Sequence, residues 1–179
     1  MKLKKKLTFS ILILSLTILG CNENDPLNRV DPFIGTDFHG HTYPGASVPF
    51  GMVQLSPDTR QVGWDACSGY HYSDNSIAGF SHTHLSGTGI GDYGDVMLMP
   101  TVDNNQKTKG DKEDPDSGFR SRFSKEHEKA SPGYYTVVLD DYNISVELTT
   151  TKRTGMHRYT FPKSDNARIV LDLSHNARI

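Results

Sequence analysis

The sequence predicts an all-β domain built as an antiparallel β-sandwich. Its apolar residues occur in short runs separated by turn-forming residues, a pattern typical of brief antiparallel strands. Beyond residue 20, no window of about twelve residues keeps apolar side chains at the i, i+3, i+4 spacing of an amphipathic helix. Many short strands without helices favour two sheets packed face to face.

Residues 1–20 are predicted to be a secretory signal rather than part of the fold. Four lysines precede an apolar run over residues 7–19. At a helical rise of about 1.5 Å per residue this run reaches roughly 20 Å, short of the roughly 30 Å hydrocarbon core of a bilayer. A permanent transmembrane helix is therefore not expected.

The end of this segment, Ile-Leu-Gly-Cys at residues 18–21, resembles the lipobox of bacterial lipoproteins. The resemblance implies that Cys21 carries a lipid anchor and that the chain resides in the bacterial cell envelope, in the periplasm or on the outer-membrane surface. An ordinary signal peptide ending near a chance cysteine is the alternative. Residues 21–29 are polar and acidic, as a tether should be, and resemble the export tag of surface lipoproteins in the Bacteroides group.

Residues 30–179 are predicted to form one domain. Its first half is rich in Gly, Pro, Asp, Ser and His, with brief strands at Phe50–Leu55 and Val96–Met99 joined by long, shaped loops. Such loops usually carry function. Asp103–Gly118 is expected to be an exposed connection, with at most one helical turn following within Arg120–Lys129.

The second half carries the clearest strand signals. Three segments mix β-branched or aromatic side chains with polar ones in alternation. Asp140–Asn143, between the first and second of these segments, has the composition of a turn. A final apolar segment is predicted to be a central strand, and because it runs to the end of the sequence we expect the domain to continue beyond residue 179. The predicted strands are Tyr134–Leu139, Ile144–Thr150, Met156–Phe161 and Ala167–Leu173.

Charge and cysteine content exclude two classes of protein. The chain has 19 basic and 21 acidic residues, and four of the basic ones lie in the signal, so the exported part carries about six negative charges. Nucleic acid is a poor partner for such a surface. If Cys21 is lipidated, Cys67 is the only thiol left, so no intrachain disulfide is expected. Cys67 is interpreted as a packing residue rather than a nucleophile.

Trp64 and Asp65 are the leading candidates for ligand contact. An indole in a polar loop offers a flat apolar face to the C–H side of a sugar ring, and an adjacent carboxylate accepts a hydrogen bond from a sugar hydroxyl. The alternative is that Trp64 plugs the edge of the domain and Asp65 caps a turn. Asp92 and Asp95 are interpreted as turn-bonding residues, not as an acid and base pair, because they share one loop.

Two histidine pairs, His39 with His41 and His82 with His84, have the spacing that places side chains on one face of a strand. Such pairs can chelate zinc or copper, but no cysteine or third clustered histidine stands near either pair in the sequence. Hydrogen-bonded or sugar-contacting histidines are therefore the favoured interpretation, and no metal ligands are expected in this chain. A zinc hydrolase built on the four histidines is kept as an alternative.

Several stretches together resemble the N-terminal domain of glycoside hydrolase family 92, bacterial calcium-dependent exo-α-mannosidases. The resemblance covers nearly all of the exported part of the chain. It rests on residues 30–36, 44–58, 63–72, 79–89 and 91–95, and on Ser131-Pro132-Gly133-Tyr134-Tyr135.

The resemblance implies a supersandwich similar to galactose-mutarotase domains, joined to an α/α toroid that this chain lacks. It implies removal of terminal mannose from glycans with inversion, and a calcium ion bound mainly outside this chain. No catalytic residue is expected here, so the chain alone should be inactive. A carbohydrate-binding lipoprotein without catalysis is the second hypothesis. The residues that the resemblance implies to contact substrate are Trp64, Asp65, Cys67 and Ser68. His82 and His84 are added to the candidate substrate-binding set as sugar-contacting histidines.

Overall fold

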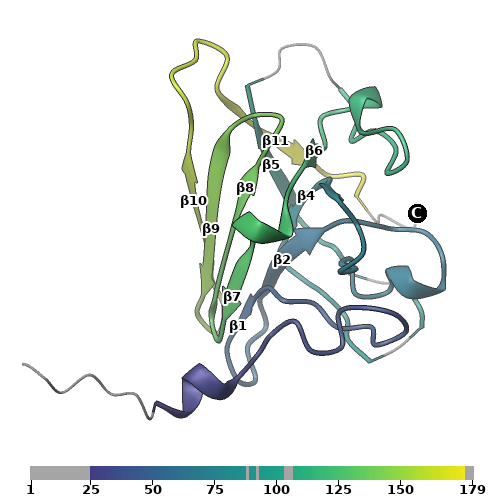
Figure 1. Cartoon of the computed structure of the whole chain (residues 1–179), viewed down its shortest axis with the longest axis vertical. Coiled ribbons are helices and arrows are strands. Elements are labelled where there is room, and N and C mark those ends of the chain that lie inside the picture. Colours follow the sequence, from purple (N-terminus) through teal and green to yellow (C-terminus); the bar gives the residue numbers. More distant parts are fainter. Residues whose placement is uncertain (1–24, 88, 92, 103–106, 176–179) are drawn as a thin grey trace, which may run out of the picture.

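The structure is a computed structural model that describes residues 25–87, 89–91, 93–102 and 107–175 (Figure 1). The predicted signal and the first four residues of the tether, Cys21 among them, lie outside the described residues. Every described helical segment is a short 3₁₀ turn, and none is long and apolar enough to cross a bilayer. These turns are η1 (Pro26–Arg29), η2 (Trp64–Ala66), η3 (Pro115–Ser117) and η4 (Lys125–His127).

The described strands form two main antiparallel sheets. The first has the strand order β1-β2-β4-β5-β11 and the second β10-β9-β8-β7, while β3 (Ser76–Ile77) and β6 (Ser121–Arg122) make a small separate pair. The five strands of the first sheet are β1 (Ala46–Ser47), β2 (Gln54–Asp58), β4 (Gly79–Ser81), β5 (Met97–Thr101) and β11 (Arg168–Asp172). Those of the second are β7 (Lys129–Ser131), β8 (Tyr134–Leu139), β9 (Ile144–Thr150) and β10 (Gly155–Thr160).

The second sheet follows directly from period-2 alternation in the sequence. Along β8 and β9 every second side chain is buried, and the register pairs Val137 with Val146 and Leu139 with Ile144. The turn between β7 and β8 places Gly133 at φ 77°, a left-handed conformation that glycine adopts without steric cost. β8 and β9 both begin and end at the predicted residues.

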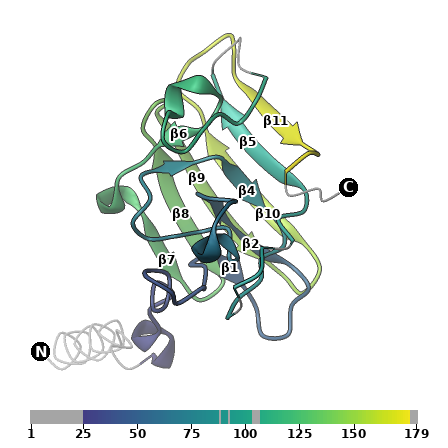
Figure 2. The same cartoon turned by 90° about the vertical axis from the view of Figure 1, so that its right-hand side faces the viewer.

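The core lies between the two sheets, which face each other in Figure 1 and overlap in the perpendicular view of Figure 2. β1 and β2 of the first sheet contact β9 of the second. Each fully buried large apolar side chain contributes about 1.5–3 kcal/mol to folding. Fully buried members of the core include Leu55, Phe80, Met97, Met99, Tyr135, Val137, Ile144 and Leu148.

The predicted sandwich and its β strands are confirmed, with corrections to two segments. β2 begins four residues later than the predicted Phe50–Leu55, because Phe50 has φ 58° and lies in an exposed turn. β11 is not central: among the described strands it pairs only with β5, at the edge of the sheet. Its outward side chains Ile169 and Leu171 are each 52 % exposed, since no described residue covers that face.

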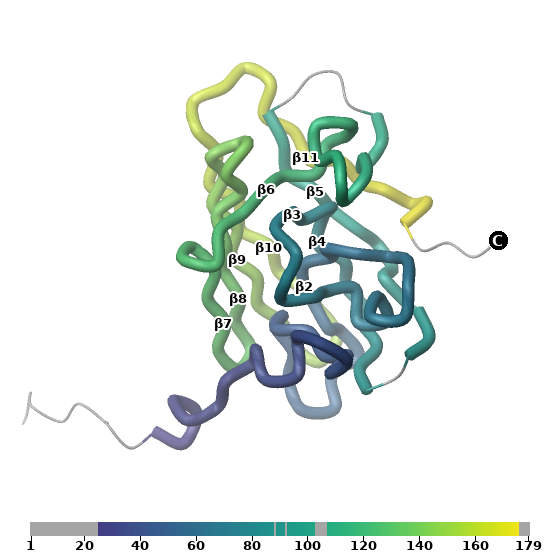
Figure 3. Tube along the Cα trace, turned by 45° about the vertical axis from the view of Figure 1, so that its right-hand side comes forward, coloured from purple at the N-terminus to yellow at the C-terminus, as the bar shows by residue number. Residues whose placement is uncertain are grey.

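The long loops of the first half gather on one side of the first sheet, away from the second sheet (Figure 3). These loops are the purple-to-teal segments over residues 31–45, 59–75, 82–87 and 93–96. The connection around η3 and the single turn of η4 agree with the exposed connection and the one helical turn that the sequence predicts. The sandwich therefore acts as a rigid base beneath a group of loops.

Candidate functional site

Asp65 is the meeting point of two loops. Its Oδ1 atom lies 2.7 Å from His39 Nδ1 and 3.0 Å from His41 Nε2. Both imidazoles therefore converge on one carboxylate oxygen, and the second oxygen, Oδ2, takes no part in these two bonds. The His41 side chain is only 7 % exposed, whereas His39 is 56 % exposed. The cluster is thus anchored on one side and open to solvent on the other.

Strained backbone holds this arrangement. Phe38 has φ 52° and His41 has φ 54°, in the left-handed region that non-glycine residues seldom occupy. Two hydrogen bonds fix the loop: Thr42 N–H donates to the Gly35 carbonyl at 3.2 Å, and Gly87 N–H donates to the His41 carbonyl at 2.8 Å. The conformation aims both histidines at Asp65.

The two imidazoles also set the charge of Asp65. Hydrogen bonds from His39 and then His41 hold the pKa of this carboxyl below its usual value, with a smaller opposing effect of burial. The group is therefore a carboxylate at neutral pH. A carboxylate fixed by two donors and facing solvent is suited to accept a hydrogen bond from a ligand hydroxyl.

Trp64 is the residue next to this aspartate and is 63 % exposed. Its ring meets the His41 ring edge-on, with 5.4 Å between the centroids. Gly63 begins the η2 turn at φ 100°, a conformation that favours glycine. A Cβ atom on Gly89 would overlap the indole, so the Gly-rich segment after His84 fits closely against Trp64. The indole is thus positioned by neighbours but presents a free face.

The floor of the site is a buried acid–histidine group. Asp58 Oδ1 lies 3.1 Å from His84 Nε2, and Asp58 Oδ2 lies 3.4 Å from His175 Nε2. Gly69, at the end of the loop that carries Trp64, packs directly against this pair. A Cβ atom at this position would lie 2.5 Å from Asp58 Oδ1 and 3.0 Å from His84 Cδ2. The Gly69 carbonyl accepts a hydrogen bond from Thr59 N–H at 2.7 Å. The loop therefore rests on the buried pair.

Comparison with known families decides the kinship of this chain. Residues 29–179 match the model of the glycosyl hydrolase family 92 N-terminal domain. The chain belongs to glycoside hydrolase family 92. This covers all but the predicted signal and most of the tether.

Solved family 92 structures share the fold. A family 92 α-mannosidase from Bacteroides thetaiotaomicron, also solved in complex with mannoimidazole, is 50 % identical with a TM-score of 0.81, over 83 % of this chain and 20 % of that one. A family 92 inverting mannosidase from the same species is 28 % identical with a TM-score of 0.68, over 82 % and 19 % of the two chains. The sandwich thus corresponds to about a fifth of a family 92 enzyme.

A curated relative agrees. An uncharacterized secreted glycosidase from Arthroderma benhamiae is 33 % identical over 147 residues, which are 80 % of this chain and 18 % of that protein. The chain therefore spans about a fifth of the length of the proteins it matches.

The structure brings together only part of the residue set that sequence reasoning assigned to substrate contact. Trp64 and Asp65 lie at the exposed edge of the site. Cys67 and Ser68 are buried, and Ser68 Oγ donates to the Tyr70 carbonyl at 3.0 Å. Contact of this family 92 domain with substrate through Cys67 and Ser68 stays a prediction.

The histidines divide in a way that the sequence did not indicate. His84 is buried on Asp58, and His82 Nε2 lies 3.1 Å from His157 Nε2, on β10. The four histidines of the zinc-hydrolase alternative therefore do not meet at one site. His39 and His41 join Asp65 instead, across 26 and 24 residues of chain, which no local pattern signals. Substrate contact by His82 and His84 stays a prediction.

Asp95 has a structural role, as expected: its Oδ2 accepts from Thr83 Oγ1 at 2.8 Å, and its N–H donates to the same hydroxyl at 2.9 Å. Asp92, the other aspartate of this loop with a predicted turn-bonding role, lies outside the described residues.

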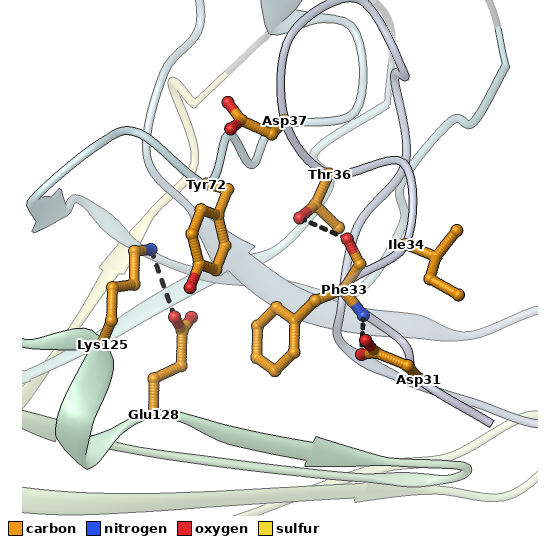
Figure 4. Close-up of a pocket in the computed structure, with 8 residues that line it drawn as sticks. All are labelled: Asp31, Phe33, Ile34, Thr36, Asp37, Tyr72, Lys125 and Glu128. Carbon is orange, nitrogen blue, oxygen red and sulfur yellow. Dashed lines mark hydrogen bonds and ion pairs between the residues drawn. The ribbon is translucent and has the colours of Figure 1, made fainter. Parts of the chain in front are cut away.

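Apart from the Asp65 cluster, the structure has a pocket of about 440 Å³ beside the loop over residues 31–37 (Figure 4). The pocket shares no lining residue with the Asp65 cluster. In it Lys125 Nζ lies 3.2 Å from Glu128 Oε2, and the Lys125 ammonium also faces the rings of Tyr70, Tyr72 and Phe123 at 4.2–4.8 Å. These charged groups satisfy one another. The lining residues are Asp31, Phe33, Ile34, Thr36, Asp37, Tyr72, Lys125 and Glu128.

The described residues do not supply a calcium site. Calcium takes six to eight oxygen ligands, mostly carboxylates and carbonyls. Among the described residues one group of metal-capable side chains converges, and it consists of His39, His41 and Asp65, with two nitrogens and one carboxylate. This donor set does not fit calcium, so no step of a reaction is assigned to calcium in this chain.

Proposed function

We propose that this chain is the β-sandwich part of an exported, inverting exo-α-mannosidase that removes terminal mannose from glycans. In this proposal the Trp64–Asp65 loop forms the rim of the sugar pocket on the leaving-group side. The observation that carries it is the ionised Asp65 carboxylate, held by two imidazoles beside a largely exposed indole. The kinship with family 92 α-mannosidases supports the substrate class.

The chemistry of the rim suits a hexose. The exposed indole face packs against the C–H face of a pyranose and excludes water from it. Asp65 then accepts a hydrogen bond from a ring hydroxyl, and the bonds from His39 and His41 fix the orientation of the carboxylate before the sugar arrives. Because the imidazoles occupy Oδ1, the hydroxyl binds at Oδ2.

Inversion needs a carboxylic acid that protonates the departing glycosidic oxygen and a carboxylate that takes a proton from the attacking water. Such groups flank the sugar about 6.5–9.5 Å apart. Asp58, Asp74 and Glu128 are buried in this chain and engaged with His84, Arg60 and Lys125 respectively. We therefore assign the acid, the base and the calcium ligands to the remainder of the enzyme, and positioning of the leaving group to this chain.

Location follows from the first residues. We propose that the signal is removed before Cys21 and that this cysteine is lipidated, which places the enzyme in the cell envelope. Mass spectrometry of the mature N-terminus tests this: a diacylated Cys21 is expected, and an unmodified N-terminus would contradict the anchor.

Activity is tested on the protein encoded by the complete reading frame that contains this chain. We expect release of mannose from α-linked mannobioses with inverted configuration, followed by NMR, and loss of activity when calcium is chelated. The chain over residues 21–179 serves as the control and should release none. Absence of mannose release from every α-mannoside by the complete protein would overturn the proposal.

A further inference from the structure

The Asp65 cluster has the composition of a transition-metal site. His39 Nδ1, His41 Nε2 and the Asp65 carboxylate come from two separate loops, and their ligand atoms all lie within 4.8 Å of one another. The sequence predicts no metal ligands in this chain, because no cysteine or third clustered histidine stands near either histidine pair. The fold supplies a third ligand, Asp65, from 24 residues beyond His41.

The spacing fits zinc without a large rearrangement. Zinc binds imidazole nitrogen and carboxylate oxygen at about 2.0–2.2 Å in tetrahedral geometry, which separates neighbouring ligand atoms by about 3.3 Å. Asp65 Oδ1 is now 2.7 Å from His39 Nδ1 and 3.0 Å from His41 Nε2. These two spacings open by a few tenths of an ångström, and the two imidazole nitrogens, which lie within 4.8 Å of each other, close toward the tetrahedral spacing as the exposed His39 side chain moves. The ion then replaces the protons that now bridge these atoms.

The donor set also selects the kind of metal. Two imidazoles and one carboxylate suit zinc and its first-row neighbours, whereas calcium and magnesium require more oxygen ligands. Three protein ligands leave a fourth position open to water or a ligand oxygen. The exposed side of the cluster, where His39 is 56 % exposed, provides that opening beside Trp64.

The ligands are held in place before any ion binds. His41 is buried against the Trp64 ring, and its carbonyl accepts a hydrogen bond from Gly87. The left-handed backbone at Phe38 and His41 fixes the direction of the loop. Little conformational entropy is therefore lost on binding, which raises affinity.

We propose that His39, His41 and Asp65 form a binding site for a divalent transition-metal ion, with Zn²⁺ as the expected occupant. The inference does not depend on the mannosidase proposal, since it concerns binding by these three side chains alone. The competing explanation is that the imidazoles only orient Asp65.

The test is Zn²⁺ titration calorimetry, with Co²⁺ absorption as a second readout, on the complete protein carrying no histidine tag. We expect a Zn²⁺ site whose affinity falls at least about tenfold in His39→Gln and Asp65→Asn. Co²⁺ should give the intense visible bands of four-coordinate geometry, and these should be lost in both variants. His39 is exposed, so its substitution leaves the fold intact, which circular dichroism checks.

His127→Gln is the matched control, because His127 is equally exposed and lies 3.9 Å from a carboxylate, Asp140, but has no second imidazole there. Its Zn²⁺ affinity and Co²⁺ bands should equal those of the wild type. Zn²⁺ affinity that is the same in wild type, His39→Gln and Asp65→Asn, or Co²⁺ spectra that do not change among them, would overturn the proposal and leave the imidazoles as a clamp on Asp65.

Discussion

Asp58 and His84 form a buried ion pair under the Trp64 loop, with 3.1 Å between Asp58 Oδ1 and His84 Nε2. The other ring nitrogen, Nδ1, lies 2.7 Å from the Gln54 carbonyl oxygen. Both ring nitrogens thus face oxygen atoms of the protein, which fixes the orientation of the ring. Because Gly69 packs directly on this pair, the position of the Trp64 loop depends on it.

Asp58→Asn should therefore destabilise the domain strongly. The substitution removes the charged carboxylate from a buried pair, and removing one member of such a pair costs about 3–5 kcal/mol of unfolding free energy. Urea unfolding measures the loss. Asp116→Asn is the control, since Asp116 pairs with Arg122 on the surface, and its unfolding midpoint should barely move. Equal midpoints for both variants would contradict the role of the pair.

The stability of the domain should also depend on the Asp58 carboxylate at acidic pH. Burial alone would raise the pKa of Asp58, but His84 and His175 outweigh burial and hold this pKa well below its usual value. A depressed folded-state pKa gives stability that is present above the unfolded pKa of about 3.9 and is lost as pH falls toward the folded value. Urea midpoints from pH 5 to pH 3 should fall more steeply in wild type than in Asp58→Asn. Parallel slopes would refute this.

Two adjacent tyrosines of β8 provide a comparison between core and surface. Tyr135 OH donates to buried Glu128 at 2.7 Å, and Tyr134 OH donates to Glu147 at 2.6 Å on the outer face. Burial, followed by the nearby Glu128 charge, raises the pKa of Tyr135 well above its usual value, so it remains a donor.

Tyr135→Phe should cost about 1.5–3 kcal/mol of unfolding free energy, because a buried carboxylate loses a donor. Tyr134→Phe should cost much less. Thermal or urea unfolding of the two variants measures both losses of unfolding free energy. A larger loss for Tyr134→Phe than for Tyr135→Phe would contradict the assignment of Tyr135 to the core and Tyr134 to the outer face.

Gly89→Ala should displace the indole of Trp64. A Cβ at this position would overlap the ring, and Trp64 is the only tryptophan of the chain, so its fluorescence reports the change directly. We expect greater quenching by acrylamide in a preparation of residues 21–179. Ser86→Ala, in the same exposed segment, should leave quenching unchanged. Identical quenching in both variants would mean that Gly89 does not support the indole.

Local patterns predicted the parts of the fold that local physics decides. β8 and β9 alternate buried and solvent-facing side chains at period 2, so both were predicted at their observed bounds. The position of β11 at the edge of the sheet was not predictable, because a continuous apolar run predicts a central strand even where one face of the strand is uncovered. The meeting of His39, His41 and Asp65 depends on two loops crossing, which no sequence period encodes.

The central claim is that the Trp64 indole borders the sugar pocket. The direct measurement compares Trp64→Ala with Val62→Ala in the complete enzyme acting on an α-mannobiose, since Val62 is also an exposed apolar residue and lies two positions before Trp64. We predict that Trp64→Ala lowers kcat/KM about tenfold, which corresponds to about 1.4 kcal/mol, and that Val62→Ala changes it little. An unchanged kcat/KM in Trp64→Ala would contradict the account.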